Sequence, residues 1–219
     1  MQVAQIIANV QKVRERLEKL SSEKVFLVAA TKTQSVENIN AVIRAGVDAV
    51  AENRVQEFRD KRGVEPCERH FIGRLQTNKV KYLVGEISLF HSCDRLELLR
   101  EISRLSLQRG VISDVLMQIN IGREETKGGF LEEEVEVAYE KFQAEEGVRL
   151  RGFMAMLPNR EEKVIRPLAR KMRELYEKKR KENPSITYLS MGMSGDFCLC
   201  VEEGSNMVRL GSTLFGGRD

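Results

Sequence analysis

Long apolar runs, cysteine clusters and an excess of one charge are all missing from this 219-residue sequence. Its longest apolar run covers only residues 25–30, whereas a membrane-spanning helix needs roughly 20 apolar residues. The four cysteines, Cys67, Cys93, Cys198 and Cys200, lack the spacing of metal ligands. Because no secretory signal is visible, we expect reduced thiols and a cytoplasmic protein without a membrane anchor.

The charge balance is close to even. Lysine and arginine number 36 against 33 aspartates and glutamates, which gives a net charge of +3. Acidic and basic residues are interleaved along the amphipathic segments, so no basic patch indicates nucleic-acid binding. With 42% hydrophobic and 32% charged residues, the composition is typical of a soluble globular protein.

Short apolar segments alternate with amphipathic ones along the whole chain after an opening helix at residues 3–20. This alternation indicates an α/β fold with a parallel sheet. Eight such units in about two hundred residues favour a closed (β/α)8 barrel of the TIM type over an open doubly wound sheet. We therefore expect one domain over residues 1–219, with the extra N-terminal helix covering the floor or side of the barrel. The predicted strands are 25–30, 49–51, 70–73, 87–91, 115–121, 150–156, 188–191 and 207–210.

Lys32 follows the first of these strands, where the chain leaves the core. An amine in a partly desolvated position can attack an aldehyde and hold it as a Schiff base. Taken alone, Lys32 is better explained as an ordinary solvated loop lysine. It gains interest from the residues near the C-terminal end of the chain.

The last two strands each end in a glycine followed by hydroxyl side chains. Ser194 lies in the sequence Met-Gly-Met-Ser-Gly-Asp, where we expect it to begin a helix, and Gly211 and Ser212 follow the eighth strand. In a (β/α)8 barrel these two turns commonly bind a phosphate group, through backbone N–H groups and the positive end of a helix dipole. The alternative is that Ser194 is an ordinary helix cap and Gly211 an ordinary turn residue.

Arg209 distinguishes between these interpretations. Strand alternation places it on the same face as Met207 and Gly211. If that face lines the barrel interior, the buried guanidinium needs an acceptor, and the pyridine nitrogen of pyridoxal phosphate is one. The alternative is an outward-facing arginine paired with a glutamate on a helix. An amine, a phosphate cradle and Arg209 are together the contacts that a pyridoxal phosphate site requires.

Five ordered motifs resemble those of the pyridoxal phosphate homeostasis proteins, a family also described as alanine racemase N-terminal-domain-like. The resemblance covers nearly the whole chain. The motifs are VAATKT at 28–33, ENRVQE at 52–57, HFIGRLQTNK at 70–79, LSMGMS at 189–194 and VRLGS at 208–212, with Phe215-Gly216 after the last.

This resemblance implies a barrel that holds pyridoxal 5'-phosphate as an internal aldimine on Lys32. It also implies an arginine, Arg209, at the ring nitrogen and Asn53 near the cofactor. The further cofactor-binding candidates implied by the matching motifs are Ser190, Met191, Ser194, Gly211 and Ser212.

Three residues depart from the family pattern. Ala51 stands where glycine is usual, Arg54 where tyrosine is usual, and Arg69 where an aromatic residue often precedes the histidine. These departures could alter the rim of the pocket, but none removes a predicted cofactor contact.

The same residues favour a cofactor carrier over an enzyme. An arginine keeps its proton, so it leaves the pyridine nitrogen unprotonated and the ring a weaker electron sink. We expect no second domain after residue 219, and the four tyrosines lie on helices or at a strand start, where none is placed as an opposing base: Tyr82, Tyr139, Tyr176 and Tyr188.

Cofactor homeostasis in a monomer, with delivery to pyridoxal-phosphate-dependent apoenzymes, is therefore the leading hypothesis. The alternatives are a racemase-like enzyme acting on a small amino acid and a lysine aldolase acting on a phosphorylated sugar. We also predict that His70 and His91 are hydrogen-bonded core residues, and we consider the loop at 123–129 a candidate mobile lid.

Overall fold

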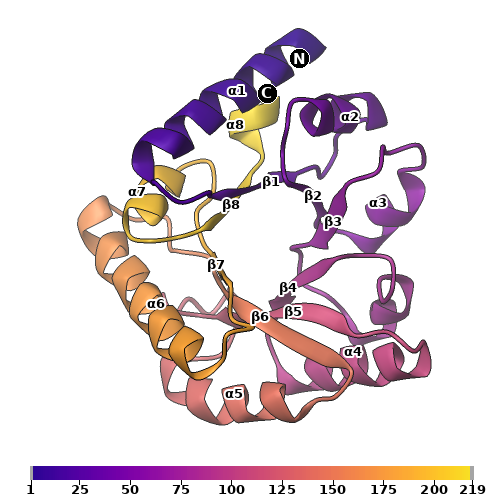
Figure 1. Ribbon diagram of the computed structural model, residues 1–219, viewed down its shortest axis with the longest axis vertical. Coiled ribbons are helices and arrows are strands. Elements are labelled where there is room, and N and C mark those ends of the chain that lie inside the picture. Colours follow the sequence, from indigo (N-terminus) through magenta and orange to yellow (C-terminus); the bar gives the residue numbers. More distant parts are fainter. Residues whose placement is uncertain (1, 218–219) are drawn as a thin grey trace.

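The computed structural model describes residues 2–217. Eight parallel strands pair in sequence order, and β8 pairs with β1 to close a barrel (Figure 1). The predicted (β/α)8 architecture is therefore confirmed. The strands are β1 (Phe26–Ala30), β2 (Ala49–Glu52), β3 (Glu68–Phe71), β4 (Leu89–Cys93), β5 (Ser113–Ile119), β6 (Val148–Ala155), β7 (Tyr188–Ser190) and β8 (Met207–Leu210).

Helices surround the barrel and connect its strands (Figure 1). The two connections nearest β3 are short: α3 and the 3-10 segment η1 have six residues each, where longer helices are usual. The helical elements are α1 (Val3–Leu20), α2 (Val36–Arg44), α3 (Val55–Asp60), η1 (Thr77–Tyr82), α4 (Leu96–Gln108), η2 (Glu132–Glu134), α5 (Val135–Ala144), α6 (Glu162–Glu182), α7 (Phe197–Glu202) and α8 (Ser212–Phe215).

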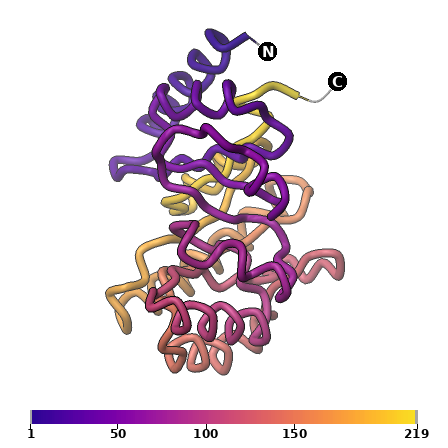
Figure 2. The backbone as a smooth tube through the Cα atoms, turned by 90° about the vertical axis from the view of Figure 1, so that its right-hand side faces the viewer, coloured from indigo at the N-terminus to yellow at the C-terminus, as the bar shows by residue number. Residues whose placement is uncertain are grey.

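The additional helix α1 covers the side of the barrel and packs against α2, α7 and α8. Its apolar stripe of Ile6, Val10, Val13 and Leu17 is buried, as the helical spacing of these residues predicts. Figure 2 shows that the first and last described segments lie at the same end of the molecule. Within residues 2–217, no helix has the length and apolar character needed to cross a membrane.

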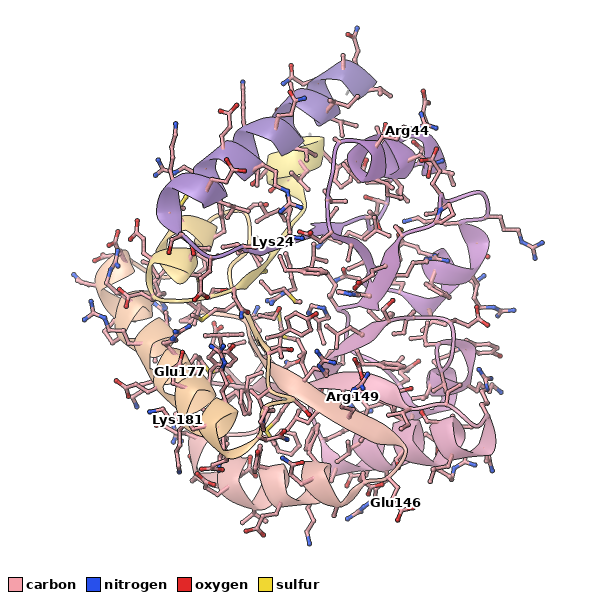
Figure 3. The ribbon with its side chains drawn as sticks, in the orientation of Figure 1. Lys24, Arg44, Glu146, Arg149, Glu177 and Lys181 are labelled. Carbon is pink, nitrogen blue, oxygen red and sulfur yellow. The ribbon has the colours of Figure 1, made fainter. Side chains whose placement is uncertain are left out.

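Strand alternation separates two apolar regions. On β1, Leu27 and Ala29 face the surrounding helices, whereas Val28 points into the barrel. Val28 is paired in register with Arg209 on β8, so the arginine also belongs to the interior layer. Charged side chains such as Arg44, Glu146 and Lys181 lie on the outer surface (Figure 3).

One glycine fixes the spacing of two strand ends that form the site. A Cβ atom on Gly73 would lie 2.0 Å from the carbonyl oxygen of Asn53, which is closer than any side chain allows. Only glycine therefore lets the segment after β3 approach the end of β2 this closely. The approach positions Asn53 at the carboxyl ends of the strands.

Candidate cofactor site

A cavity of about 560 Å³ lies at the carboxyl ends of the strands, between the segments that follow β1, β2, β7 and β8. Apolar side chains, including Ile72, Met156 and Phe215, form part of its wall. Six of the residues predicted from the sequence line it: Lys32, Asn53, Ser194, Arg209, Gly211 and Ser212.

Ser190 and Met191, the other two predicted residues, do not line this cavity. Both are fully buried, with no exposed surface. Ser190 lies behind Arg209 and hydrogen bonds to it. The direct cofactor contacts of Ser190 and Met191 stay predictions, and the structure gives Ser190 a supporting position.

A buried ion pair holds the end of β1, one residue before Lys32. The Thr31 hydroxyl and the Lys61 ammonium both donate to Oε1 of Glu52, each at 2.6 Å. Lys61 also donates to the carbonyl oxygen of Thr31 at 2.7 Å. Side-chain exposure is 4% for Glu52 and 11% for Lys61, so solvent screens this pair only weakly.

The residue after Lys32 is held as well. Thr33 has a φ of 63°, unusual for a residue other than glycine, and its N–H donates to Oε2 of Glu57 at 2.7 Å. Burial alone would raise the pKa of Glu57, but the bonds from Thr33 and Lys61 lower it below its usual value. The backbone on both sides of Lys32 is therefore fixed by side chains of β2, α3 and the residue that follows α3.

Asn53 carries an acceptor that no described residue uses. Its Oδ1 atom is buried and has no hydrogen-bond partner within residues 2–217, and the residue lines the cavity. A buried polar atom without a partner is costly. A ligand that donates a hydrogen bond here would remove that cost.

Ser194 joins the last two turns. Its hydroxyl oxygen accepts hydrogen bonds from the N–H groups of Gly211 at 3.4 Å and Thr213 at 3.2 Å. Because that oxygen acts as the acceptor, its own proton is available to an anion in the cavity. The N–H groups of Ser194, Gly195 and Ser212 have no acceptor among the described residues, which suits a phosphate group.

The prediction that Ser194 begins a helix is wrong. Helix α7 begins at Phe197, three residues later. Gly192 has a φ of 105°, and Asp196 Oδ1 accepts the N–H of Met193 at 2.6 Å, so the chain makes a tight turn before the helix. Ser194 lies in that turn, and its hydroxyl reaches the neighbouring β8 connection in place of capping its own helix.

Arg209 faces the barrel interior and is only 5% exposed. One terminal nitrogen donates to the carbonyl oxygen of Ser190 at 2.9 Å and to its hydroxyl at 2.6 Å, and the other donates to the carbonyl oxygen of Ala155 at 3.0 Å. Burial lowers its pKa to about 10. No carboxylate among residues 2–217 forms an ion pair with it, so the alternative of an outward arginine paired with a glutamate is excluded.

A chain of buried polar groups continues from Arg209 along the barrel axis. His91 contacts Ser190 Oγ through Nδ1 at 3.2 Å and His70 Nδ1 through Nε2 at 3.0 Å. His70 Nε2 then contacts Oε2 of Glu68 at 3.2 Å, where β3 begins. The prediction of hydrogen-bonded core histidines is confirmed, and burial lowers the pKa of both.

The hydrogen bonds from Arg209 to Glu68 all run in one direction from donor to acceptor. Arginine can only donate, so the Ser190 hydroxyl accepts from Arg209, and because the Glu68 carboxylate at the other end can only accept, that hydroxyl donates its hydrogen bond to His91 Nδ1. His91 then donates from Nε2 to His70, and His70 donates from Nε2 to the carboxylate of Glu68. Every side-chain contact then joins one donor to one acceptor, with both histidines neutral. The network connects the cavity floor with the amino-terminal end of the barrel.

The remaining sequence predictions lie outside the cavity. None of the four tyrosines lines it, and neither does the loop at 123–129, whose proposed lid role stays a prediction. That loop is held by Asn120, which bonds to the backbone of Glu124 and Lys127. Of the departures from the family pattern, Ala51 is buried in the barrel interior, and Arg54 and Arg69 line hollows on the outer wall.

The sequence model of the family described as "Alanine racemase, N-terminal domain" matches residues 1–219. The chain belongs to this family. A similar family member from Aquifex aeolicus is 40% identical over 221 residues, which cover 99% of this chain and 96% of that protein. Another from Escherichia coli K12 is 36% identical over 210 residues, which cover 91% of this chain and 88% of that protein. Both are named "Pyridoxal phosphate homeostasis protein".

Solved structures of several similar proteins have the same fold. A protein from Bifidobacterium adolescentis superposes with a TM-score of 0.90 at 29% identity, covering 97% of this chain and 95% of that one. PipY of Synechococcus elongatus PCC7942 was solved with pyridoxal phosphate bound. It superposes with a TM-score of 0.80 at 28% identity, and the match covers 93% of this chain and 100% of that one. Alanine racemase from Clostridium difficile, at 19% identity and a TM-score of 0.76, shows the barrel fold alone, since this chain covers 56% of its length.

Proposed function

We propose that this chain binds pyridoxal 5'-phosphate in the cavity at the carboxyl ends of the strands and acts in pyridoxal phosphate homeostasis, holding the cofactor and releasing it. The two curated relatives carry that name, and PipY has the same ligand bound. The observation that carries the proposal is the convergence of Lys32, Arg209 and the Ser194 turn on one cavity.

Each group in the cavity fits one part of this cofactor. The free N–H groups of Ser194, Gly195 and Ser212 and the Ser194 hydroxyl would hold its phosphate. Donors of Arg209 not used by Ser190 and Ala155 would face its ring nitrogen. The unpaired Oδ1 of Asn53 would accept a hydrogen bond from it. When bound, the cofactor supplies an aldehyde, and the Lys32 amine is the nucleophile positioned to take it.

A carrier role follows from the charge on Arg209. With a pKa of about 10, the guanidinium stays protonated at neutral pH and would donate to the ring nitrogen without transferring a proton. The ring is then a weak electron sink, which disfavours turnover of an amino acid and favours storage. Racemase-like chemistry is the second candidate, and it would need an opposing base that none of the four tyrosines supplies within this cavity.

The proposal extends to the oligomeric state of the chain, its location and the recipients of the cofactor. The cavity is lined by residues of one barrel, and we propose that this single domain binds the cofactor as a monomer. We propose further that the carrier is cytoplasmic and that pyridoxal-phosphate-dependent apoenzymes are its recipients.

Equilibrium dialysis with pyridoxal phosphate tests this function. We expect one equivalent bound to the wild-type chain, with a visible absorption band that the Lys32→Ala variant lacks. A matched Lys19→Ala variant, altered at an exposed residue of α1, should bind like the wild type. Binding by Lys32→Ala with an unchanged band would refute the assignment of Lys32, and no binding by the wild type would refute the function. Proton exchange at the α-carbon of alanine, above the rate with free cofactor, would favour the racemase-like alternative.

A further inference from the structure

A basic groove runs along the outer wall of the barrel between α3, η1 and the end of α4. It consists of two adjoining hollows of about 220 and 490 Å³, which share Arg59 and Tyr82. The groove exists because α3 and η1 are only six residues long and cover this side of the barrel incompletely. The exposed cations that define it are Arg54, Arg59, Arg62, Arg74, Lys79 and Lys81.

The cations of the basic groove are unpaired. None of its six defining cations forms an ion pair with any carboxylate of residues 2–217. Glu86 is the one carboxylate in its lining. Many cations elsewhere are paired: on α6, for example, Arg166 contacts three glutamates. Within residues 2–217, the groove therefore gathers six unpaired cations on one surface of a nearly neutral chain.

Three of these cations surround one aromatic ring. The Arg59 guanidinium lies 4.4 Å from the centre of the Tyr82 ring, and the ammonium groups of Lys81 and Lys79 lie at 5.2 and 5.8 Å. The ring attracts each cation, but the like charges repel one another. An anion placed between them would relieve that repulsion, so the cluster is preorganised for a negatively charged ligand.

The geometry favours one class of anion. The faces of Tyr82 and Phe58 are occupied by the guanidiniums of Arg59 and Arg69, at 4.4 and 3.9 Å, so neither ring offers a platform on which a nucleobase would stack. The cations are long exposed side chains spread over two hollows, unlike the convergent backbone N–H groups that hold a compact phosphate. Several carboxylates spaced along an extended chain match this distribution better.

We propose that the basic groove docks an acidic segment of a partner protein. Arginine and tyrosine are enriched in such interfaces, and complementary charge accelerates encounter. Asn53 lines both the smaller hollow of the groove, of about 220 Å³, and the cofactor cavity, so a docked partner would lie beside the cavity mouth. The proposal does not depend on the bound cofactor, because the six cations hold none of the predicted contacts to it.

The test uses a fluorescein-labelled peptide of ten glutamates, measured by fluorescence anisotropy with the full chain at 20 and 150 mM NaCl. The variant Arg62→Glu with Lys81→Glu reverses two cations of the groove. The matched control, Lys12→Glu with Lys19→Glu, makes the same charge change on exposed, unpaired residues of α1. The bound pyridoxal phosphate content of both variants, read from absorbance, monitors folding independently of docking.

We expect wild-type binding that weakens at the higher salt concentration, at least a tenfold loss in the groove variant, and less than a twofold change in the control. Equal losses in both variants would show non-specific attraction and overturn the proposal, as would failure of the wild type to bind the peptide. Pyrophosphate or a single-stranded oligonucleotide that bound through Arg62 and Lys81 more tightly than the peptide would also overturn it, in favour of a phosphate ligand.

Discussion

The hydroxyl of Ser190 accepts a hydrogen bond from the guanidinium of Arg209 at 2.6 Å, deep in the barrel and out of contact with solvent. The same hydroxyl is within reach of His91. Ser190 thus connects the arginine that faces the cofactor cavity to the polar chain along the barrel axis. The orientation of Arg209 depends on a residue that does not itself line the cavity.

Replacing Ser190 by alanine should therefore affect both stability and binding. The change leaves a buried N–H of Arg209 and the Nδ1 atom of His91 without partners, which costs about 1–3 kcal/mol of the free energy of unfolding. We expect weaker cofactor binding as well, because the guanidinium is then held only by the backbone carbonyl groups of residues 190 and 155. Urea denaturation and equilibrium dialysis measure the two effects. The exposed Ser22→Ala variant is the control, and equal behaviour of the two variants would contradict this role for Ser190.

The two axial histidines predict a loss of stability in mild acid. Burial lowers the pKa of His91 well below 6.5 and lowers that of His70. Below pH 6.5 the unfolded chain therefore binds more protons than the folded chain, so the free energy of unfolding decreases as the pH falls. The slope should approach about 1.4 kcal/mol per pH unit for each histidine. Urea denaturation from pH 7.5 to 5.5 measures it, and a flat profile over this range would refute the neutral, buried assignment.

The ion pair between Glu52 and Lys61 should be far more important than a surface pair. In Lys61→Met, Glu52 becomes a buried carboxylate without its cation, and we expect a loss of about 3–5 kcal/mol in the free energy of unfolding. The exposed pair of Arg44 and Glu65 provides the comparison, because Arg44→Met should cost at most about 1 kcal/mol. The double variant Glu52→Gln with Lys61→Met should recover part of the loss. Equal effects of Lys61→Met and Arg44→Met would contradict this account.

Gly73 should not tolerate a side chain. In Gly73→Ala the new methyl group would lie 2.0 Å from the Asn53 carbonyl oxygen, so the two strand ends must separate. Overpacking of this kind costs about 1–3 kcal/mol or more, and it moves Asn53 away from the cavity, which should also weaken cofactor binding. In Gly195→Ala nothing lies within 4 Å of the new atom, so thermal denaturation should show an unchanged midpoint. An unchanged midpoint for Gly73→Ala as well would show that the backbone adapts to the methyl group, and it would contradict this prediction.

Local sequence patterns indicated the fold, and together with the family resemblance they identified six residues of the cavity. Short apolar segments between amphipathic ones identified the strands. Side-chain parity, a local property of a strand, placed Arg209 on one face with Met207 and Gly211, but it left open whether that face lines the barrel interior. The role of Ser194 could not be obtained in this way. Its hydroxyl bonds to Gly211 and Thr213, and such a contact depends on how β7 and β8 lie relative to each other.

The hydrogen bonds that hold the backbone beside Lys32 also depend on contacts between different strands, so the sequence did not predict them. Glu52 and Lys61 come from β2 and the residue after α3, and they meet Thr31 only when the strands have closed into a barrel. The order of donors from Arg209 to Glu68 likewise requires residues of β8, β7, β4 and β3 to share the barrel axis. One signal was available in the sequence: Glu52 is an acidic residue directly after three apolar strand residues, which is unusual for a buried position.

Borohydride reduction of the chain loaded with pyridoxal phosphate, followed by peptide mapping, tests the central claim most directly. The account predicts a single pyridoxyl group on the amine of Lys32, which lies in the cavity with Arg209 and Ser194. A stable modification on a different lysine, with Lys32 unmodified, would contradict it.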